Sequence, residues 1–141
     1  MNDPEHVLIG LSGVADPLPV AQTTLDPYVR EFLELDSLAG VADNRHLWTT
    51  LRDNPEGAVQ LDYANTVTLN KADLASTGQL KTTRALLTVL NPLAEVYETA
   101  HATVHPVHVL NGRAFDPAQL GAGLRTVQHT KGLSLAGTRA L

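Results

Sequence analysis

The sequence feature that most constrains the fold is a junction at residues 66–73, where an apolar run meets a short polar loop. The first four residues, Thr-Val-Thr-Leu, are β-branched or aliphatic, which is the composition of a buried strand. The loop Asn-Lys-Ala-Asp follows at once, and a helix-like segment comes directly after it. A strand that leads through a short loop into a helix predicts a βαβ unit, in which neighbouring strands run parallel.

The same alternation of strand and helix continues along the chain. Short apolar runs predict strands at residues 6–9, 37–42, 66–69 and 95–99. Helices are expected at residues 17–25, 28–35, 45–51 and 58–64, and from Ser76 to about residue 90. One more helix could start at residues 116–120, and residues from 121 onward read as a loose tail or the start of a linker.

Local signals mark the ends of the longest predicted helix. Ser76 with Gln79 three residues later resembles a capping box, and Asn91 with Pro92 ends the segment. We therefore expect an α/β fold, with a mostly parallel sheet of about four strands and helices on both of its faces. The four strands would contain Leu8, Leu38, Val67 and Val96.

Composition restricts the class of protein. A chain of 141 residues fits one domain, and its aromatic content of 4% predicts an aliphatic core. The net charge of −5 argues against a nucleic-acid or anionic-membrane surface, which needs clustered Lys and Arg. The absence of cysteine excludes disulfides and thiolate metal sites. With neither a long apolar run nor a signal-peptide pattern, we expect a soluble cytoplasmic protein.

The polar loop at residues 70–73 has the chemistry needed to read guanine. Guanine presents two donors side by side, and the carboxylate of Asp73 can accept both, whereas adenine would leave that carboxylate unpaired. Asn70 can hold the loop and reach the base edge, and the aliphatic stem of Lys71 can cover the flat face of the base. The loop thus resembles the guanine-reading signature of P-loop GTPases. A strand-to-helix turn with a polar cap is the alternative.

Several further motifs, in collinear order, resemble those of the CobW-type GTPases (CobW/HypB/UreG). The family reads Glu-x-x-Gly, Ala-Asp-Pro and Pro-Val after a strand, and residues 9–20 here are similar except at the acidic position. The other matching segments are residues 35–43, 60–65, 70–74 and 90–94. The resemblance covers about residues 6–120 and implies the C-terminal half of a GTPase domain. The family comprises GTP-dependent metallochaperone-like proteins linked to zinc homeostasis, cobalamin synthesis and enzyme maturation.

The departures from the family concern the phosphate half of the site. The sequence has no Gly-x-x-x-x-Gly-Lys-[Ser/Thr] loop, and the nearest pattern, at residues 132–139, lacks the lysine. Gly10 stands where the family has the acidic residue near Mg²⁺, and the Cys-x-Cys-Cys metal motif has no counterpart. We therefore expect weak binding of GTP or GDP through the guanine end, no Mg²⁺ and no zinc site.

The resemblance implies a domain over residues 1–120 that lacks the P-loop half and is not catalytic alone. The expected partners are a guanine nucleotide and either a complementary P-loop-bearing chain or a second copy, with no nucleic acid and no membrane. The alternative function is a non-catalytic interaction module derived from a GTPase fold, which would bind a partner through its exposed sheet edge.

The remaining candidate residues each allow two interpretations. The Gly13 amide would face the γ-phosphate by resemblance, or Gly13 is a turn glycine that meets no phosphate. Asp43 follows a predicted strand and is expected to be a helix N-cap. His101, His105 and His108 are weak metal candidates, because Pro106 and β-branched neighbours argue against the continuous helix that would align them, so a set of loop histidines is the main interpretation.

Overall fold

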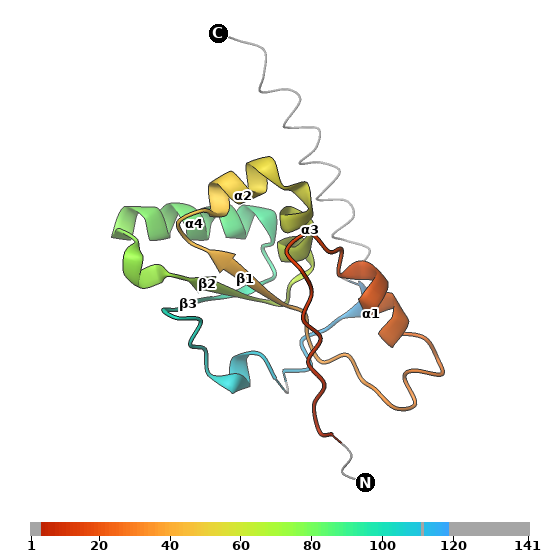
Figure 1. Cartoon of the computed structure of the whole chain (residues 1–141). Helices are drawn as coiled ribbons and strands as arrows, with labels where there is room; N and C mark the ends of the chain where they lie inside the picture. Colours follow the sequence, from red (N-terminus) through yellow and green to blue (C-terminus); the bar gives the residue numbers. More distant parts are fainter. Residues whose placement is uncertain (1–3, 111, 119–141) are drawn as a thin grey trace.

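A computed structural model describes residues 4–110 and 112–118 of the chain (Figure 1). Its sheet has three parallel strands in the order β1-β2-β3, formed by β1 (Ala39–Asp43), β2 (Thr66–Asn70) and β3 (Glu95–Glu98). Asp43 pairs with Asn70 at the end of the register, so β1 and β2 finish together. The α/β class and the parallel sheet expected from the sequence are confirmed.

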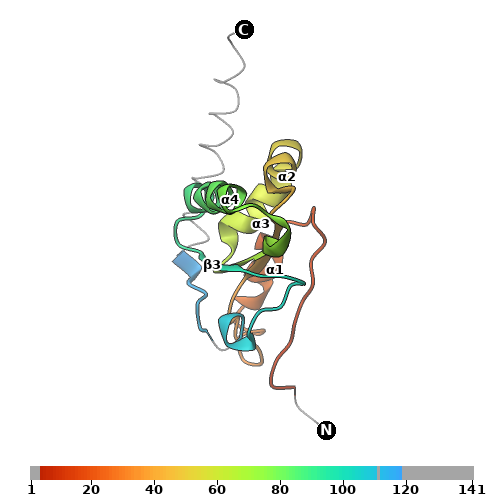
Figure 2. The ribbon, with the colours of Figure 1, turned by 90° about the vertical axis from the view of Figure 1, so that its left-hand side faces the viewer.

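The helices of the two crossovers cover one face of the sheet. They are α2 (Leu47–Asp53) and α3 (Pro55–Tyr63) between β1 and β2, and α4 (Thr77–Leu90) between β2 and β3 (Figures 1 and 2). The segment with the short helix η2 (Pro106–His108) runs on the opposite side. The strands are adjacent in sequence order, and both crossover connections have the same hand, so both place their helices on the same face. In the described part of the chain the opposite face therefore carries no crossover helix.

The core is built around β2, whose first four residues are all buried. Val67 and Leu69 are 1% and 0% exposed, and they pack with Ala42 of β1, Leu61 of α3 and Leu87 of α4. Because β2 has a strand on each side and helices over one face, the aliphatic residues Val67 and Leu69 are buried together with the hydroxyl residues Thr66 and Thr68 that alternate with them. This burial explains why residues 66–69 gave the clearest strand signal in the sequence.

The helix boundaries follow local capping chemistry. The expected capping box is confirmed: the Gln79 backbone N–H donates to Ser76 Oγ at 3.2 Å, and the Ser76 N–H donates to Gln79 Oε1 at 3.0 Å. At α3 the Asn54 side chain accepts from the Gly57 N–H, with Pro55 in the first turn. The helix expected at residues 58–64 therefore begins three residues earlier than predicted, because Asn54 caps it and Pro55 opens it.

Two predicted elements upstream of β1 are wrong. Residues 6–9 were expected as a strand but form none, and Leu8 is 81% exposed. Residues 28–35 were expected as a helix, but residues 28–32 form turns and residues 33–35 form neither helix nor strand, with Phe32 84% exposed. Both runs have the required apolar residues but no element that buries them in the described structure. Because residues 6–9 form no strand, the sheet of the described residues has three strands instead of four.

The other expected helices and strands form within a few residues of their predicted bounds. The helix expected at residues 17–25 is α1 (Leu18–Thr24), and the short helix η1 (Ala72–Leu74) follows β2. Residues 117 and 118 are helical, whereas the rest of the helix expected there and the tail at residues 121–141 lie outside the described residues. Across residues 4–110 and 112–118, none of the helices is long and apolar enough to cross a bilayer.

One buried side chain joins the ends of two helices. Asn91 follows α4, and its Nδ2 lies 2.8–2.9 Å from the carbonyl oxygens of Leu61, Asp62 and Ala64 at the end of α3. Its Oδ1 accepts from the backbone N–H groups of Leu93 and Ala94, both at 3.1 Å. Asn91 thus satisfies the last carbonyls of one helix while it shapes the turn that leads into β3.

Replacing Asn91 by aspartate should destabilise the fold strongly. The N91D change is nearly isosteric, but it removes the amide donor and places a carboxylate against three carbonyl oxygens. We expect the free energy of unfolding to fall by about 3 kcal/mol or more, as measured by chemical denaturation. The matched control is N54D, because aspartate is as good an N-cap as asparagine, and its effect should stay below about 0.5 kcal/mol. Equal stability of N91D and wild type would contradict this role for Asn91.

Half-burial of Asp62 predicts a pH-dependent stability. Burial raises the pKa of the Asp62 carboxyl from 3.8 to about 6, and in the described structure its buried Oδ2 has no hydrogen-bond partner. Because the folded state then binds the proton more tightly than the unfolded chain, stability should decrease as pH rises from about 4 to about 6.

The D62N variant should lose this pH dependence and be more stable than wild type at neutral pH. Thermal melts across that pH range measure both effects. The exposed carboxylate of Asp53 provides the control, because D53N should leave the decrease in place. A wild-type protein that becomes more stable between pH 4 and pH 6 would refute the assignment.

Candidate functional site

The candidate site lies at the carboxyl edge of the sheet, where all three parallel strands end together. Asp43 is the last residue of β1, and Asn44 follows it. Asn70 is the last residue of β2, and the loop at residues 70–73 continues from it into η1. Thr99 follows β3. Backbone bonds fix this edge: the Asn44 N–H donates to the Asn70 carbonyl at 3.0 Å, and the Thr99 N–H donates to the Leu69 carbonyl at 2.9 Å. In open α/β sheets this edge is where ligands bind.

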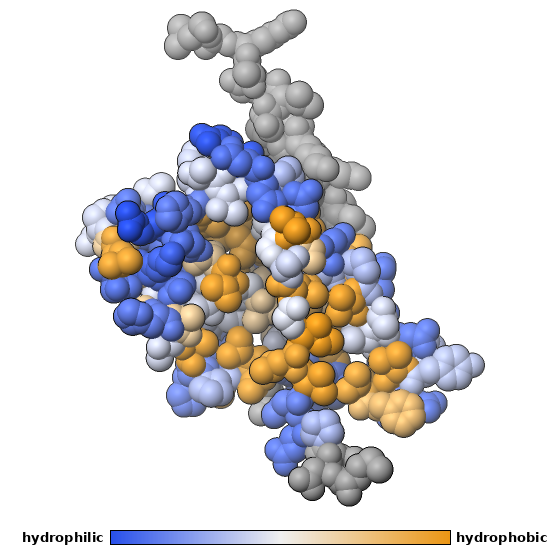
Figure 3. Space-filling model, viewed as in Figure 1, coloured by the Kyte–Doolittle hydropathy of each residue, from blue (hydrophilic) through white to orange (hydrophobic). Residues whose placement is uncertain are grey.

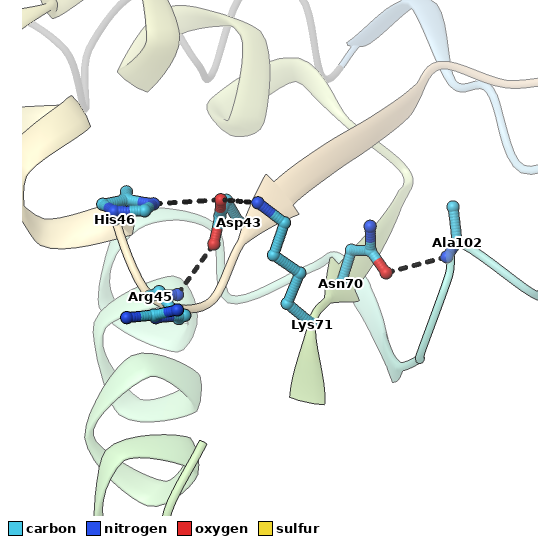
Figure 4. Close-up of polar contacts among 6 residues, drawn as sticks. All are labelled: Asp43, Arg45, His46, Asn70, Lys71 and Ala102. Atoms are coloured by element: carbon cyan, nitrogen blue, oxygen red, sulfur yellow. Dashed lines mark hydrogen bonds and ion pairs between the residues drawn. The ribbon is translucent and has the colours of Figure 1, made fainter. Parts of the chain in front are cut away.

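The loop after β2 has a defined shape. Lys71 adopts the left-handed conformation with φ 62° and ψ 31°, which turns the chain sharply from the strand into η1. The Asn70 Oδ1 accepts from the Ala102 N–H at 2.7 Å (Figure 4), and the Ala72 N–H donates to the Thr99 carbonyl at 3.0 Å. Asn70 and Ala72 of the predicted guanine motif are therefore attached to the loop that follows β3.

Asp73 is placed differently from its neighbours. It lies in η1, it is exposed, and in the described part of the chain its carboxylate has no hydrogen-bond or ion-pair partner. A carboxylate with open coordination beside an ordered amide, Asn70, and a lysine stem, Lys71, can accept a pair of adjacent N–H donors from a planar ligand. The three predicted residues thus come from one loop and one edge of the sheet.

The structure adds an acidic residue that sequence reasoning assigned to another role. Asp43 was expected to be a helix N-cap, but α2 has His46 at its N-cap and no side-chain capping bond. The Asp43 Oδ2 instead accepts from Lys71 Nζ at 2.7 Å and from His46 Nδ1 at 3.1 Å, and its Oδ1 accepts from the Arg45 N–H at 2.9 Å (Figure 4).

These bonds determine the charge state of Asp43. Burial opposes ionisation of the carboxyl, but hydrogen bonds from Lys71, His46 and the Arg45 backbone outweigh it and hold the pKa of Asp43 well below its usual range. The carboxylate is therefore ionised at neutral pH, and it forms an ion pair with Lys71 across the ends of β1 and β2.

The sequence also did not predict that the loop at residues 99–102 lies beside the candidate site. His101 and Ala102 both have φ 53°, a left-handed conformation that is uncommon for residues other than glycine, and Ala102 contacts Asn70. The position of this loop after the last predicted strand was a signal that it reaches the candidate site, because parallel strands bring the loops that follow them to one edge of the sheet. The residue types themselves do not predict the conformation.

Gly13, which the family resemblance places near the γ-phosphate, lies on the loop that precedes α1. Gly13 is exposed, a Cβ added there would meet nothing within 4 Å, and its φ is not positive. Its loop is attached to α3 by the Gln60 Nε2, which donates to the carbonyls of Ser12 and Ala15 at 2.7 and 2.6 Å. Gly13 makes no hydrogen bond to residues 70–73, and its assignment to the phosphate end stays a prediction from the family resemblance.

The described residues do not fit the metal ions that the family resemblance implies. Gly10 offers no carboxylate for Mg²⁺, and a Cβ there would also meet nothing within 4 Å. His105 Nδ1 accepts from the Val107 N–H, and the His108 ring stacks on Tyr97 with centroids 4.1 Å apart. Within the described ranges no group of three or more His, Cys, Asp or Glu could hold a metal, and His101, His105 and His108 form none.

The parallel sheet with its crossover helices matches a P-loop GTPase-like α/β fold. The family model for the CobW/HypB/UreG nucleotide-binding domain matches residues 1–98, and the chain belongs to that family. The family expected from the sequence motifs is thereby confirmed.

Relatives agree with this assignment, and a solved structure agrees with the fold. The chain is 30% identical over 105 residues to the zinc-regulated GTPase metalloprotein activator 1 of Schizosaccharomyces pombe, with 73% of this chain and 26% of the relative covered. It is 26% identical over 137 residues to the protein of the same name from Dictyostelium discoideum, covering 79% and 29%. The crystal structure of the Zn(II)-bound YjiA GTPase from E. coli superposes with a TM-score of 0.66 at 24% identity, covering 73% of this chain and 32% of that one. The chain thus spans between a quarter and a third of the length of these proteins.

Proposed function

We propose that the chain carries the guanine-recognising half of a CobW-type GTP-binding site. The observation that supports this proposal is the loop at residues 70–73, in which Asn70 and Lys71 are ordered and the Asp73 carboxylate is exposed and unpaired within the described structure. Asp73 would accept the N1–H and the exocyclic amine of the base. Asn70 would offer its Nδ2 to the base edge while its Oδ1 holds the loop, and Lys71 would cover the flat face.

We also propose that this chain alone does not catalyse the hydrolysis of GTP. Hydrolysis of GTP depends on loop amides and a lysine that position the phosphates, and on stabilisation of the charge that develops on them. The sequence has no phosphate-binding loop, and Gly10 replaces the acidic residue of the family motif. A complementary chain that carries such a loop, or a second copy, would be the partner. We also propose a cytoplasmic location, on the basis of the acidic, cysteine-free composition.

A second candidate function is a non-catalytic interaction module. The observation that favours it is the exposed apolar stretch upstream of β1, in which Val7, Leu8 and Ile9 are 55%, 81% and 57% exposed (Figure 3). Val41 of the edge strand β1 is 68% exposed as well. Exposed apolar residues beside an unpaired strand edge are typical of surfaces that bind another polypeptide.

The purified chain should release no phosphate from GTP above background. The physical reason is that nothing in this sequence positions the β- and γ-phosphates in line with a water molecule. A phosphate-release assay with the full chain measures this. Turnover that exceeds background and disappears in the D73A variant would refute the proposal, whereas turnover that D73A retains would indicate a contaminating enzyme.

GTP, GDP and guanosine should bind alike and weakly, because the phosphates add little. A charge-assisted contact at Asp73 contributes about 1.5–3 kcal/mol, and a dissociation constant of about 1 mM corresponds to ~4 kcal/mol. NMR titration should therefore give dissociation constants in the millimolar range or weaker. The D73N variant should lose the preference for guanosine over adenosine, because an amide cannot accept two donors from one base edge.

The D53N variant is the matched control for this titration, because Asp53 is an exposed aspartate on α2 that pairs with Arg52 away from the loop. Micromolar binding of GTP but not of guanosine would reveal a phosphate site and contradict the half-site. An equal response to ATP and GTP would favour the interaction module instead.

A further inference from the structure

Asp43 has no part in the guanine-binding roles described above, yet it contacts one of the three residues that carry them. Its Oδ2 lies 2.7 Å from Lys71 Nζ, across the ends of the adjacent strands β1 and β2 (Figure 4). The two residues are 28 positions apart in the sequence, so the contact depends entirely on the parallel pairing of the strands.

Both ends of this ion pair are fixed by other bonds. On the side of β1, the Asp43 carboxylate also accepts from the Arg45 N–H and from His46 Nδ1, which leaves it one orientation. On the side of β2, the Lys71 backbone is held in the left-handed conformation, and the next residue, Ala72, donates its N–H to the Thr99 carbonyl. The methylene stem of Lys71 therefore spans between two fixed points at the edge of the sheet.

Such a stem differs from that of an ordinary surface lysine. A lysine side chain with a free ammonium group samples many rotamers, because it has four rotatable carbon–carbon bonds and a strongly hydrated charge. The side chains of Lys71 and Asp43 are 45% and 31% exposed, and ion pairs with that exposure contribute little to the stability of a fold. The main effect of the pair is thus on where the lysine stem lies.

We propose that Asp43 is a positioning residue, which holds the Lys71 ammonium so that the lysine stem lies along the flat face of a bound guanine base. This inference rests on the proposed guanine site and adds a residue from outside the loop to it. Asp43 would not touch the base. Its removal should weaken binding through Lys71, while Asp73 continues to select guanine over adenine.

The test is a comparison of wild type, D43N, K71M and the double variant D43N/K71M, with guanosine as the NMR probe. K71M keeps an unbranched side chain that can cover a base but cannot pair with Asp43. We expect D43N to weaken guanosine binding by about threefold to tenfold, within the range that couplings between contacting residues produce. In the K71M background, D43N should cause no further loss. The control D53N should bind guanosine as wild type does.

Two outcomes would overturn the role of Asp43. One is a D43N variant that binds guanosine as tightly as wild type. The other is a D43N variant that loses as much affinity in the K71M background as in the wild-type background, because the loss would then come through the fold and not through Lys71. A retained preference for guanosine over adenosine in D43N supports the division of labour with Asp73, and a lost preference contradicts it.

A measurement without nucleotide separates this inference from the proposed function. The Lys71 side-chain NMR signals should be distinct and unaveraged in wild type and in D53N, and should average in D43N. Averaged signals already in wild type would overturn the positioning role even if guanosine binds. A wild-type chain with ordered Lys71 signals and no response to guanosine would instead overturn the guanine site, and the role of Asp43 at that site with it.

Discussion

The burial of β2 is the constraint on which the rest of the structure depends. Val67 and Leu69 have almost no exposed surface, and the helices α3 and α4 pack against them through Leu61 and Leu87. Burial at this level contributes about 1.5–3 kcal/mol for each large aliphatic side chain. It also fixes the register of β2 against β1 and β3, since a shift by one residue would move every side chain of β2 to the opposite face.

The fixed register explains why the loops of the candidate site meet at one edge of the sheet. Because β1 and β2 end together, Asp43 and Asn70 are paired residues, and the side chain of Lys71 finds a carboxylate at the end of the neighbouring strand. The loop at residues 99–102 reaches the same edge because β3 is also parallel, and there Ala102 meets Asn70. The loop geometry thus follows from the sheet and does not need the ligand to create it.

The sequence predicted what depends on local patterns. The strand at residues 66–69, the capping box of Ser76 and Gln79, and the end of α4 before Pro92 all arise from residues within a few positions of one another. The strand expected at residues 6–9 and the helix expected at residues 28–35 failed for a shared reason. An apolar pattern reports that a segment can be buried, but it does not report whether another element is present to bury it.

In the candidate site, too, the sequence predicted the local features and missed the long-range contacts. The residue types of the loop at residues 70–73 were readable, because guanine recognition needs a carboxylate, an amide and an aliphatic stem close together. The sequence did not predict the contact between Lys71 and Asp43, because it joins residues far apart in sequence. It did not predict the left-handed backbone of Ala102 either, because alanine does not favour that conformation. A local motif therefore indicated which ligand chemistry is possible, while the tertiary contacts that order the motif appeared only in the structure.

The proposed half-site would separate selectivity from affinity in a nucleotide-binding fold. Selectivity for one base needs only an exposed carboxylate at the right edge of the sheet, because the wrong base leaves that carboxylate desolvated and unpaired. Affinity needs the charged phosphates to be held, and Gly13, which the family resemblance places beside them, lies on an exposed loop attached to α3. A loop of this kind alone would distinguish guanine while supplying little of the free energy that holds a nucleotide, and tight binding would need phosphate-binding groups that these 141 residues do not contain.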